Sequence, residues 1–186
     1  MRYSFVLLAM GIGAFAADTV VTFEPAKSQV HWTLGTTFHT VHGTFQLKSG
    51  TIQFDPATGK ASGQIVVSAA SGESGDRSRD KKMHSTVLES IRFPDVVFTP
   101  DLVKGKVAAE GKSTIDVHGN FQLHGQGHEF TMPVEVEMKN GVANTTSKFT
   151  IPFLKWGLKN PSILMARVNE AVDVEIQATA RVTNGN

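Results

Sequence analysis

Apolar and polar residues alternate with a period of two along most of the chain. In the stretch 115–123 every second residue, beginning with Ile115, is apolar or glycine, and the residues between are polar. The same alternation is found in 29–34, 129–138, 148–153 and 172–179. A period of two is typical of a β-strand that turns one face to an apolar core and the other to water.

Weaker strand patterns fill most of the remaining chain. They cover 43–55, 61–70 and 94–103. Turn sequences separate the strands, and these are Asp55–Gly59, Lys104-Gly105, Gly125-Gln126-Gly127 and Asn140-Gly141. The pattern therefore predicts about eight antiparallel strands in meander order.

Two segments depart from the strand pattern. Between residues 76 and 90 the chain is mostly polar, and apolar side chains recur at helical spacing at Met83, Val87, Leu88 and Ile91. This spacing predicts one short amphipathic helix, inserted between two strands and ending before Pro94. The second segment, 154–169, has no regular pattern, and we expect a long loop there.

Eight meandering strands with one apolar face can close into a barrel or stack as a sandwich. The polar faces carry charges such as Glu135 and Asp173, and the chain has only two Trp and one Tyr. An outer-membrane barrel would show aromatic girdles instead, so we expect the apolar face to be internal. An eight-stranded barrel is either filled by its own side chains or holds one small ligand, and the pattern leaves both open.

The first residues match a secretory signal peptide. Arg2 is followed by an apolar run from Tyr3 to Phe15 and by an Ala-x-Ala exit. The alternative is an uncleaved membrane anchor, but the run is shorter than the ~20 apolar residues that a spanning helix needs. We therefore expect cleavage after Ala16, a mature single domain over 17–186, and a periplasmic or secreted protein.

Composition excludes several classes of chemistry. The 186 residues are 40% hydrophobic and 19% charged, as in one globular domain. The absence of Cys excludes disulfides, thiolate metal sites, Cys nucleophiles and a lipoprotein anchor. Without Arg2 the chain has 17 basic and 17 acidic residues. This neutrality predicts no electrostatic footprint for nucleic acid or an anionic membrane. Beyond the first residues no segment is long and apolar enough to span a bilayer as a helix, so we expect no stable membrane insertion.

The histidines are the only candidate metal ligands of note. The seven are His31, His39, His42, His84, His118, His124 and His128. A zinc or copper site needs three or four converging ligands, and no HExxH motif is present. We expect turn or surface histidines and no metal or other cofactor. An exported metal-binding or redox-accessory protein with a filled barrel is the alternative.

Three charged residues fall together in the predicted helix. Asp80 and His84 are four residues apart and share a face, and Arg79 lies beside them. We expect Arg79 and Asp80 to fix the helix to a neighbouring loop. The alternative is that His84 contacts a ligand head group.

The sequence offers no catalytic machinery. It has no Gly-x-Ser-x-Gly elbow and no Gly-rich phosphate loop, and neither Ser85 nor Ser162 has an identifiable base. We therefore expect no enzyme.

Several motifs, in order along the chain, resemble the YceI-like family. They are Ser28–Trp32, Val41–Phe45, Arg79–His84 with Phe93–Phe98, Leu123–His128, and Trp156–Ser162. Together they span nearly the whole mature chain. The resemblance implies an all-β fold, an eight-stranded antiparallel lipocalin-like barrel with one short inserted helix. It also implies an exported protein that binds a polyisoprenoid, quinone-like or fatty-acyl chain in an internal tunnel.

The lining of that tunnel is predicted from the apolar faces, the helix and the last loop. The candidate ligand-binding residues are Trp32, Phe45, Phe54, Val67, Met83, Leu88, Phe98, Phe121, Met132, Phe149, Trp156 and Leu158, with His84 as a candidate head-group contact. The identity of the lipid, the formation of a homodimer, and a role in transport, storage or stress protection stay open.

Overall fold

The computed structural model describes residues 18–162 and 167–184. The predicted signal peptide and its cleavage site lie outside these residues. The strands are β1 (Thr19–Phe23), β2 (Gln29–Gly35), β3 (Thr40–Phe54), β4 (Ala61–Glu73), β5 (Asp95–Lys104), β6 (Gly111–Leu123), β7 (Gln126–Lys139), β8 (Val142–Ile151) and β9 (Val172–Asn184). The helical elements are η1 (Pro25–Lys27), α1 (Arg77–Lys82) and the π-helical turn η2 (Met83–Val87).

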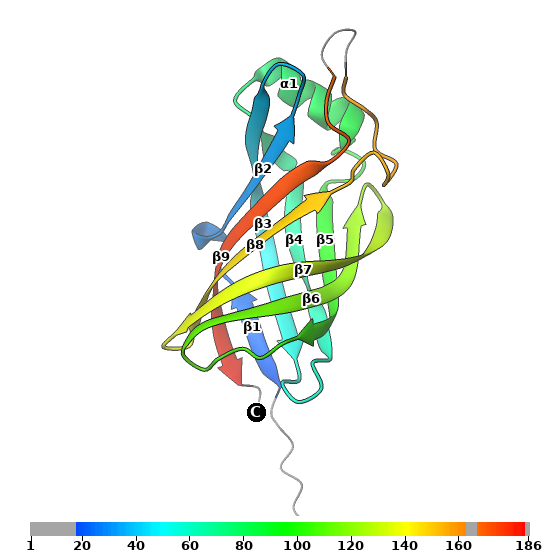
Figure 1. The fold of residues 1–186 in the computed structure, drawn as a ribbon. Coiled ribbons are helices and arrows are strands. Elements are labelled where there is room, and N and C mark those ends of the chain that lie inside the picture. The colour runs from blue at the N-terminus through cyan, green and yellow to red at the C-terminus, as the bar shows by residue number, and fades with distance from the viewer. Residues whose placement is uncertain (1–17, 163–166, 185–186) are drawn as a thin grey trace, which may run out of the picture.

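The nine strands form an eight-stranded closed antiparallel barrel, because β1 and β2 occupy one position in it. Both pair with β3 on one side and with β9 on the other, and η1 interrupts them. From β3 to β9 each strand pairs with the next strand in the chain, including β3 with β4. The predicted meander barrel is thus confirmed, and the sandwich alternative is wrong (Figure 1).

The predicted apolar face is internal. In β6, Ile115, Val117 and Phe121 are at most 8% exposed. The residues that alternate with them face outward, since Asp116 and Asn120 are exposed and His118 is half-buried. Gly119 lies on the inward face beside β5, where an added Cβ would be 2.2 Å from the carbonyl oxygen of Thr99. Glycine at this position therefore lets two strands approach closely.

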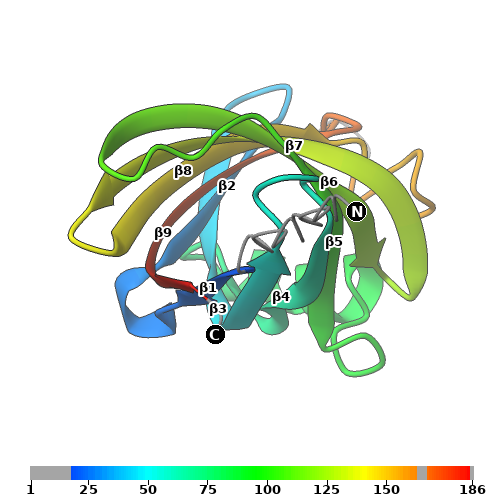
Figure 2. The same cartoon turned by 90° about the horizontal axis from the view of Figure 1, so that it is seen from below.

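The meander gives the barrel two distinct ends. The connections β2–β3, β4–β5, β6–β7 and β8–β9 lie at one end together with α1, and we name it the helix end. The connections β3–β4, β5–β6 and β7–β8 lie at the other, the terminal end, where β1 begins and β9 finishes. Figure 2 looks along the barrel from the terminal end and shows the strands around a common axis.

The inserted helix has the predicted position but is shorter than expected. Its N-cap is Asp76, whose carboxylate accepts a hydrogen bond from the backbone N–H of Arg79 at 2.8 Å. After Lys82 the chain widens into η2, and Ile91 is completely exposed rather than on a buried helix face. Within the described residues, no helix has the length and apolar character needed to cross a membrane.

Candidate ligand-binding cavity

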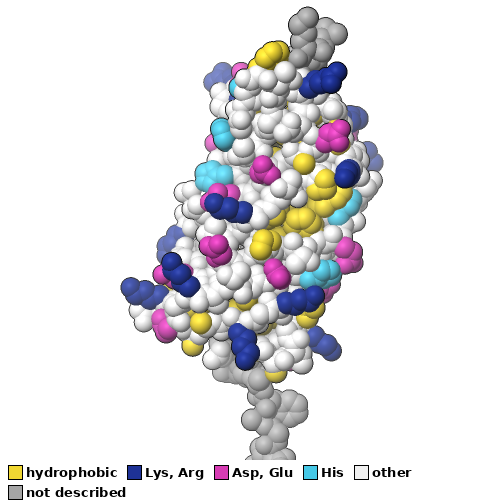
Figure 3. Space-filling model, viewed as in Figure 1, with side chains coloured by type: hydrophobic (Ala, Val, Ile, Leu, Met, Phe, Trp, Pro, Cys, Tyr) yellow, Lys and Arg dark blue, Asp and Glu magenta, His cyan; other side chains and the backbone are white. Residues whose placement is uncertain are grey.

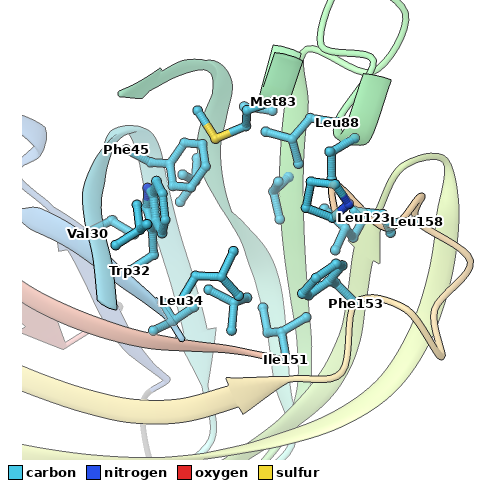
Figure 4. Close-up of a pocket in the computed structure, with 18 of the residues that line it drawn as sticks. Val30, Trp32, Leu34, Phe45, Met83, Leu88, Leu123, Ile151, Phe153 and Leu158 are labelled. Carbon is cyan, nitrogen blue, oxygen red and sulfur yellow. The ribbon is translucent and has the colours of Figure 1, made fainter. Parts of the chain in front are cut away.

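A cavity of about 550 Å³ occupies the helix-end half of the barrel. Its walls are mostly apolar side chains from β2 to β6, β8 and β9, and Met83 and Leu88 cover it from the helical segment (Figure 4). Trp32 and Phe45 face it from β2 and β3, with their ring centroids 6.4 Å apart. We name this space the helix-end cavity.

Within residues 18–162 and 167–184, the charged side chains of the helix-end cavity come from the helical segment alone. They are Asp76, Arg79 and Lys82. The Lys82 ammonium donates to the carbonyl oxygen of Pro161 at 2.7 Å, and so joins α1 to the β8–β9 connection. The cavity therefore has apolar walls and a polar rim on one side.

A second cavity of about 620 Å³ occupies the terminal-end half. Its walls come mainly from β1, β3, β7, β8 and β9, and the segment 105–109 contributes from the β5–β6 connection. The hydroxyl of Ser147, which also lines it, donates to the carbonyl oxygen of Pro133 at 2.7 Å. This terminal-end cavity is thus also mostly apolar.

Three residues line both cavities: Ile65, Phe98 and Ile176. Ile65 and Phe98 are partners in the β4–β5 pairing, and Phe98 is only 4% exposed. We name these residues the belt. Each hollow lies within the roughly 300–1,000 Å³ range of small-molecule pockets, so the barrel is not filled by its own side chains.

The predicted ligand-binding residues divide between the two cavities. The helix-end cavity is lined by Trp32, Phe45, Val67, Met83, Leu88, Phe98, Phe121, Phe149 and Leu158. The terminal-end cavity is lined by Phe54, Met132 and again Phe98. That any of these side chains contacts a ligand stays a prediction.

Several lining residues were missed by the sequence reasoning. Val30, Leu34 and Val174 lie on the same alternating faces as the predicted residues, so the pattern could have found them. Phe153 ends the alternating stretch 148–153, so the pattern could have found it as well. Pro161 comes from the irregular β8–β9 connection, and no periodic signal marks it.

Trp156 was expected to cap or line the tunnel, and it lines neither cavity. Its indole stacks on the imidazole of His128, with centroids 4.1 Å apart and planes 4° apart. It also packs on the rings of Phe121 and Phe130, at 5.5 and 5.8 Å. The indole therefore supports the aromatic wall from behind, and its effect on a ligand acts through Phe121.

Trp156→Ala is accordingly expected to affect stability more than ligand retention. The indole is half-buried, so the loss in unfolding free energy should be about 2–3 kcal/mol, below the ~3–5 kcal/mol of a fully buried aromatic. Urea denaturation measures this loss. The neighbouring exposed Lys155→Ala should stay within about 0.5 kcal/mol of wild type. Equal stability of the two variants would contradict the supporting role.

The expected anchoring role of Arg79 and Asp80 is confirmed, with Ser74 between them. Arg79 donates to the hydroxyl and carbonyl oxygens of Ser74, at 2.7 and 2.9 Å, and that hydroxyl donates to the Asp80 carboxylate. Both ring nitrogens of His84 are engaged, with the hydroxyl of Ser90 and the carbonyl oxygen of Gly72. A head-group contact by His84 stays a prediction, and a ligand would have to compete with these bonds.

Two other histidines join elements through carboxylates. Nε2 of His124 donates to Glu89 at 2.6 Å, which is the main reason that the pKa of Glu89 lies below its ordinary value. His118 on β6 bridges Asp101 of β5, 2.6 Å from Nδ1, and Glu129 of β7, 3.0 Å from Nε2. Among the described residues, no three or more His, Asp or Glu side chains are grouped to hold a metal ion.

The bridge at His118 predicts a pH-dependent stability. The pKa of the His118 imidazole is raised, chiefly by the hydrogen bond to Asp101. Protonated His118 therefore stabilises the folded state, and this stabilisation is fully present below the pKa of about 6.5 that histidine has in the unfolded chain. It is lost as the pH rises through the higher pKa of His118 in the folded protein. The stability difference between wild type and His118→Gln should therefore shrink from about pH 6 to pH 9 in urea denaturation. A difference independent of pH would contradict the bridge.

Comparison with known sequences gives matches over most of the chain. A family model described as the YceI-like domain matches residues 21–180. A UPF0312 protein of Pseudomonas savastanoi pv. phaseolicola is 32% identical over 136 residues, covering 67% of this chain and 68% of that protein. A UPF0312 protein of Vibrio parahaemolyticus is 28% identical over 137 residues, covering 71% and 67%.

Solved structures share the fold at low identity. Burkholderia cenocepacia BcnA has a TM-score of 0.69 at 16% identity, covering 84% of this chain and 98% of that one. A structure described as a polyisoprenoid binding domain from Saccharophagus degradans, implicated in plant cell wall breakdown, has a TM-score of 0.66 at 12% identity. It covers 88% of this chain and 98% of its own. These likenesses support the barrel architecture.

Proposed function

The chain belongs to the YceI-like domain family, and from this premise we propose that it is a binding protein for a long apolar chain held inside the barrel. The observation that carries the proposal is the interior itself. Two apolar hollows of about 550 and 620 Å³ meet at the belt, and the charged residues of the first gather at its helical rim.

The energetics of such a site favour long ligands. Each methylene group moved from water to an apolar surface contributes about 0.8 kcal/mol. Loss of translational and rotational freedom opposes binding by roughly 4–15 kcal/mol. A short hydrocarbon therefore binds weakly, whereas a polyisoprenoid, quinone-like or fatty-acyl chain has enough methylene groups to offset this cost.

The proposal includes the orientation of the ligand in the barrel. The polar end lies at the rim of the helix-end cavity, near Arg79 and Lys82, and the hydrocarbon extends toward the belt. A chain too long for the first hollow displaces the belt side chains and enters the terminal-end cavity. A fold relative described as polyisoprenoid-binding supports this class of ligand.

The place of action is part of the same proposal. The basic start, the apolar run and the Ala-x-Ala sequence before residue 17 support export through a cleaved signal peptide. The protein then works in the periplasm or outside the cell as a carrier or store, and not as an enzyme.

Organic extraction of the purified protein, followed by mass spectrometry, tests the proposed function. We expect about one long-chain lipid per protein molecule. Metal analysis of the same untagged sample tests the histidine alternative. Stoichiometric zinc or copper without lipid would overturn the proposal, as would lipid-free protein that also fails to take up added polyisoprenoid or fatty acid.

A further inference from the structure

The fold gathers basic residues at the helix end, although the chain as a whole is almost neutral. The four helix-end connections contain eight Lys or Arg and four Asp or Glu, whereas the three terminal-end connections contain two of each. Overall neutrality, from which no electrostatic footprint for an anionic membrane is predicted, does not record this local excess. The excess follows from the meander, which places alternate connections together.

Most of these basic side chains face solvent. The exposed ones are Arg77, Lys81, Arg92, Lys155, Lys159 and Arg167. Among the acidic residues of the described helix-end connections, Asp76 and Glu170 are exposed, while Asp80 and Glu89 are half-buried. Glu89 is further engaged by His124 and lies 4.0 Å from Lys159. The solvent-facing side chains of these connections are therefore net positive.

In the part of the chain that the structure describes, two large exposed apolar side chains lie at the same end. Phe38, at the tip of the β2–β3 hairpin, is 69% exposed, and Ile91, after η2, is 100% exposed. The hairpin is held beside a basic residue, because the backbone N–H of Thr37 donates to the carbonyl oxygen of Arg167 at 3.0 Å. Figure 3 shows hydrophobic and basic side chains together at this end of the molecule.

We propose that the helix end is a docking surface for an anionic lipid bilayer. Exposed apolar side chains enter the headgroup boundary while Lys and Arg are attracted to the negative surface, and stable but reversible attachment needs both signals. Phe38 and Ile91 supply the first signal, and the exposed cations of α1 and the β8–β9 connection supply the second.

A bilayer fits this surface better than a folded partner does. Among the described residues, Phe38 and Ile91 stand on separate connections and neither lines a cavity. Their setting is charged, whereas the core of a protein interface is depleted of charge. If the proposed function holds, docking also turns the rim of the helix-end cavity toward the source of the lipid.

Vesicle flotation with the full mature protein tests the docking surface. We expect binding to vesicles of phosphatidylcholine with about a third phosphatidylglycerol to be at least tenfold stronger than to phosphatidylcholine alone, and to fall at ~0.5 M salt, where charges are screened. Arg77→Glu with Lys81→Glu should lower it about tenfold or more. Phe38→Ser with Ile91→Ser should lower it several-fold.

The matched control carries the same charge change at the terminal end. Lys60→Glu with Lys112→Glu, both exposed and lining neither cavity, should bind like wild type, and thermal unfolding verifies that every variant is folded. An equal loss of vesicle binding in the two double variants with reversed charges would overturn the proposal. Wild-type binding that does not depend on anionic lipid would also overturn it. Association of the protein with itself through Phe38 and Ile91, without vesicle binding, would do the same. Bound lipid is quantified separately by extraction, so failure to dock is distinguishable from an empty cavity.

Discussion

Phe121→Asp is expected to lower the free energy of unfolding by about 5 kcal/mol or more, which is a large share of the roughly 5–15 kcal/mol that holds a typical domain folded. Phe121 is 7% exposed and packs on Phe98, Phe130 and Phe149, with ring centroids 5.7–6.4 Å apart. Loss of a buried Phe side chain alone costs roughly 3–5 kcal/mol. The new carboxylate would also be buried among aromatic rings, which adds its desolvation cost.

Urea denaturation of Phe121→Asp beside Gln122→Asp measures the effect. Gln122 is the next residue on β6, faces outward and is exposed, so its variant should stay within about 0.5 kcal/mol of wild type. The result that contradicts the account is the reverse order, with Gln122→Asp the less stable protein. It would mean that the apolar face of β6 points outward.

Val67→Phe is expected to reduce lipid retention at least tenfold without loss of stability. Val67 lines the helix-end cavity from β4, where it pairs with Leu47 of β3 and Val96 of β5. In a close-packed core an enlarged side chain costs about 1–3 kcal/mol of strain. In a hollow the added ring is buried without strain, and it occupies space that the ligand needs.

Thr99→Phe is the matched control, since Thr99 is exposed and its side chain points away from the interior next to Phe98. It adds an aromatic ring to the outside of the barrel, and lipid retention should be unchanged. Retention is measured by extraction and mass spectrometry, and stability by thermal unfolding. A Val67→Phe protein that keeps its lipid but loses a few kcal/mol of stability would show that this part of the interior is packed.

The barrel was predictable because strand alternation and turn sequences are local signals. In β6 both the period of two and the face toward the core are correct from 115 to 123. The pairing of β1 was not predictable, because five residues at the start of the domain carry too little pattern to show that they continue the position of β2. The helix was correct to within its π-helical turn, which differs from an α-helix by one hydrogen-bond step.

The site was predictable only in part, since a hollow depends on how side-chain volumes add up across the barrel. The alternation of apolar and polar residues predicts which side chains point inward. It does not predict that the space between Trp32 and Phe98 stays open. The position of Trp156 depends on how an irregular loop folds back onto His128, for which a sequence has no periodic signal. The charge of the helix end was missed for a related reason, because net charge does not record which connections the fold brings together.

A crystal structure of the protein as purified, without added detergent, tests the central claim most directly. The account predicts elongated density inside the barrel, beginning near the rim at Arg79, passing Trp32 and Phe45, and reaching the belt at Phe98. Continuous density beyond the belt indicates a chain that also occupies the terminal-end cavity. A barrel whose two hollows are closed by the inward side chains, with no room for a hydrocarbon, would contradict it.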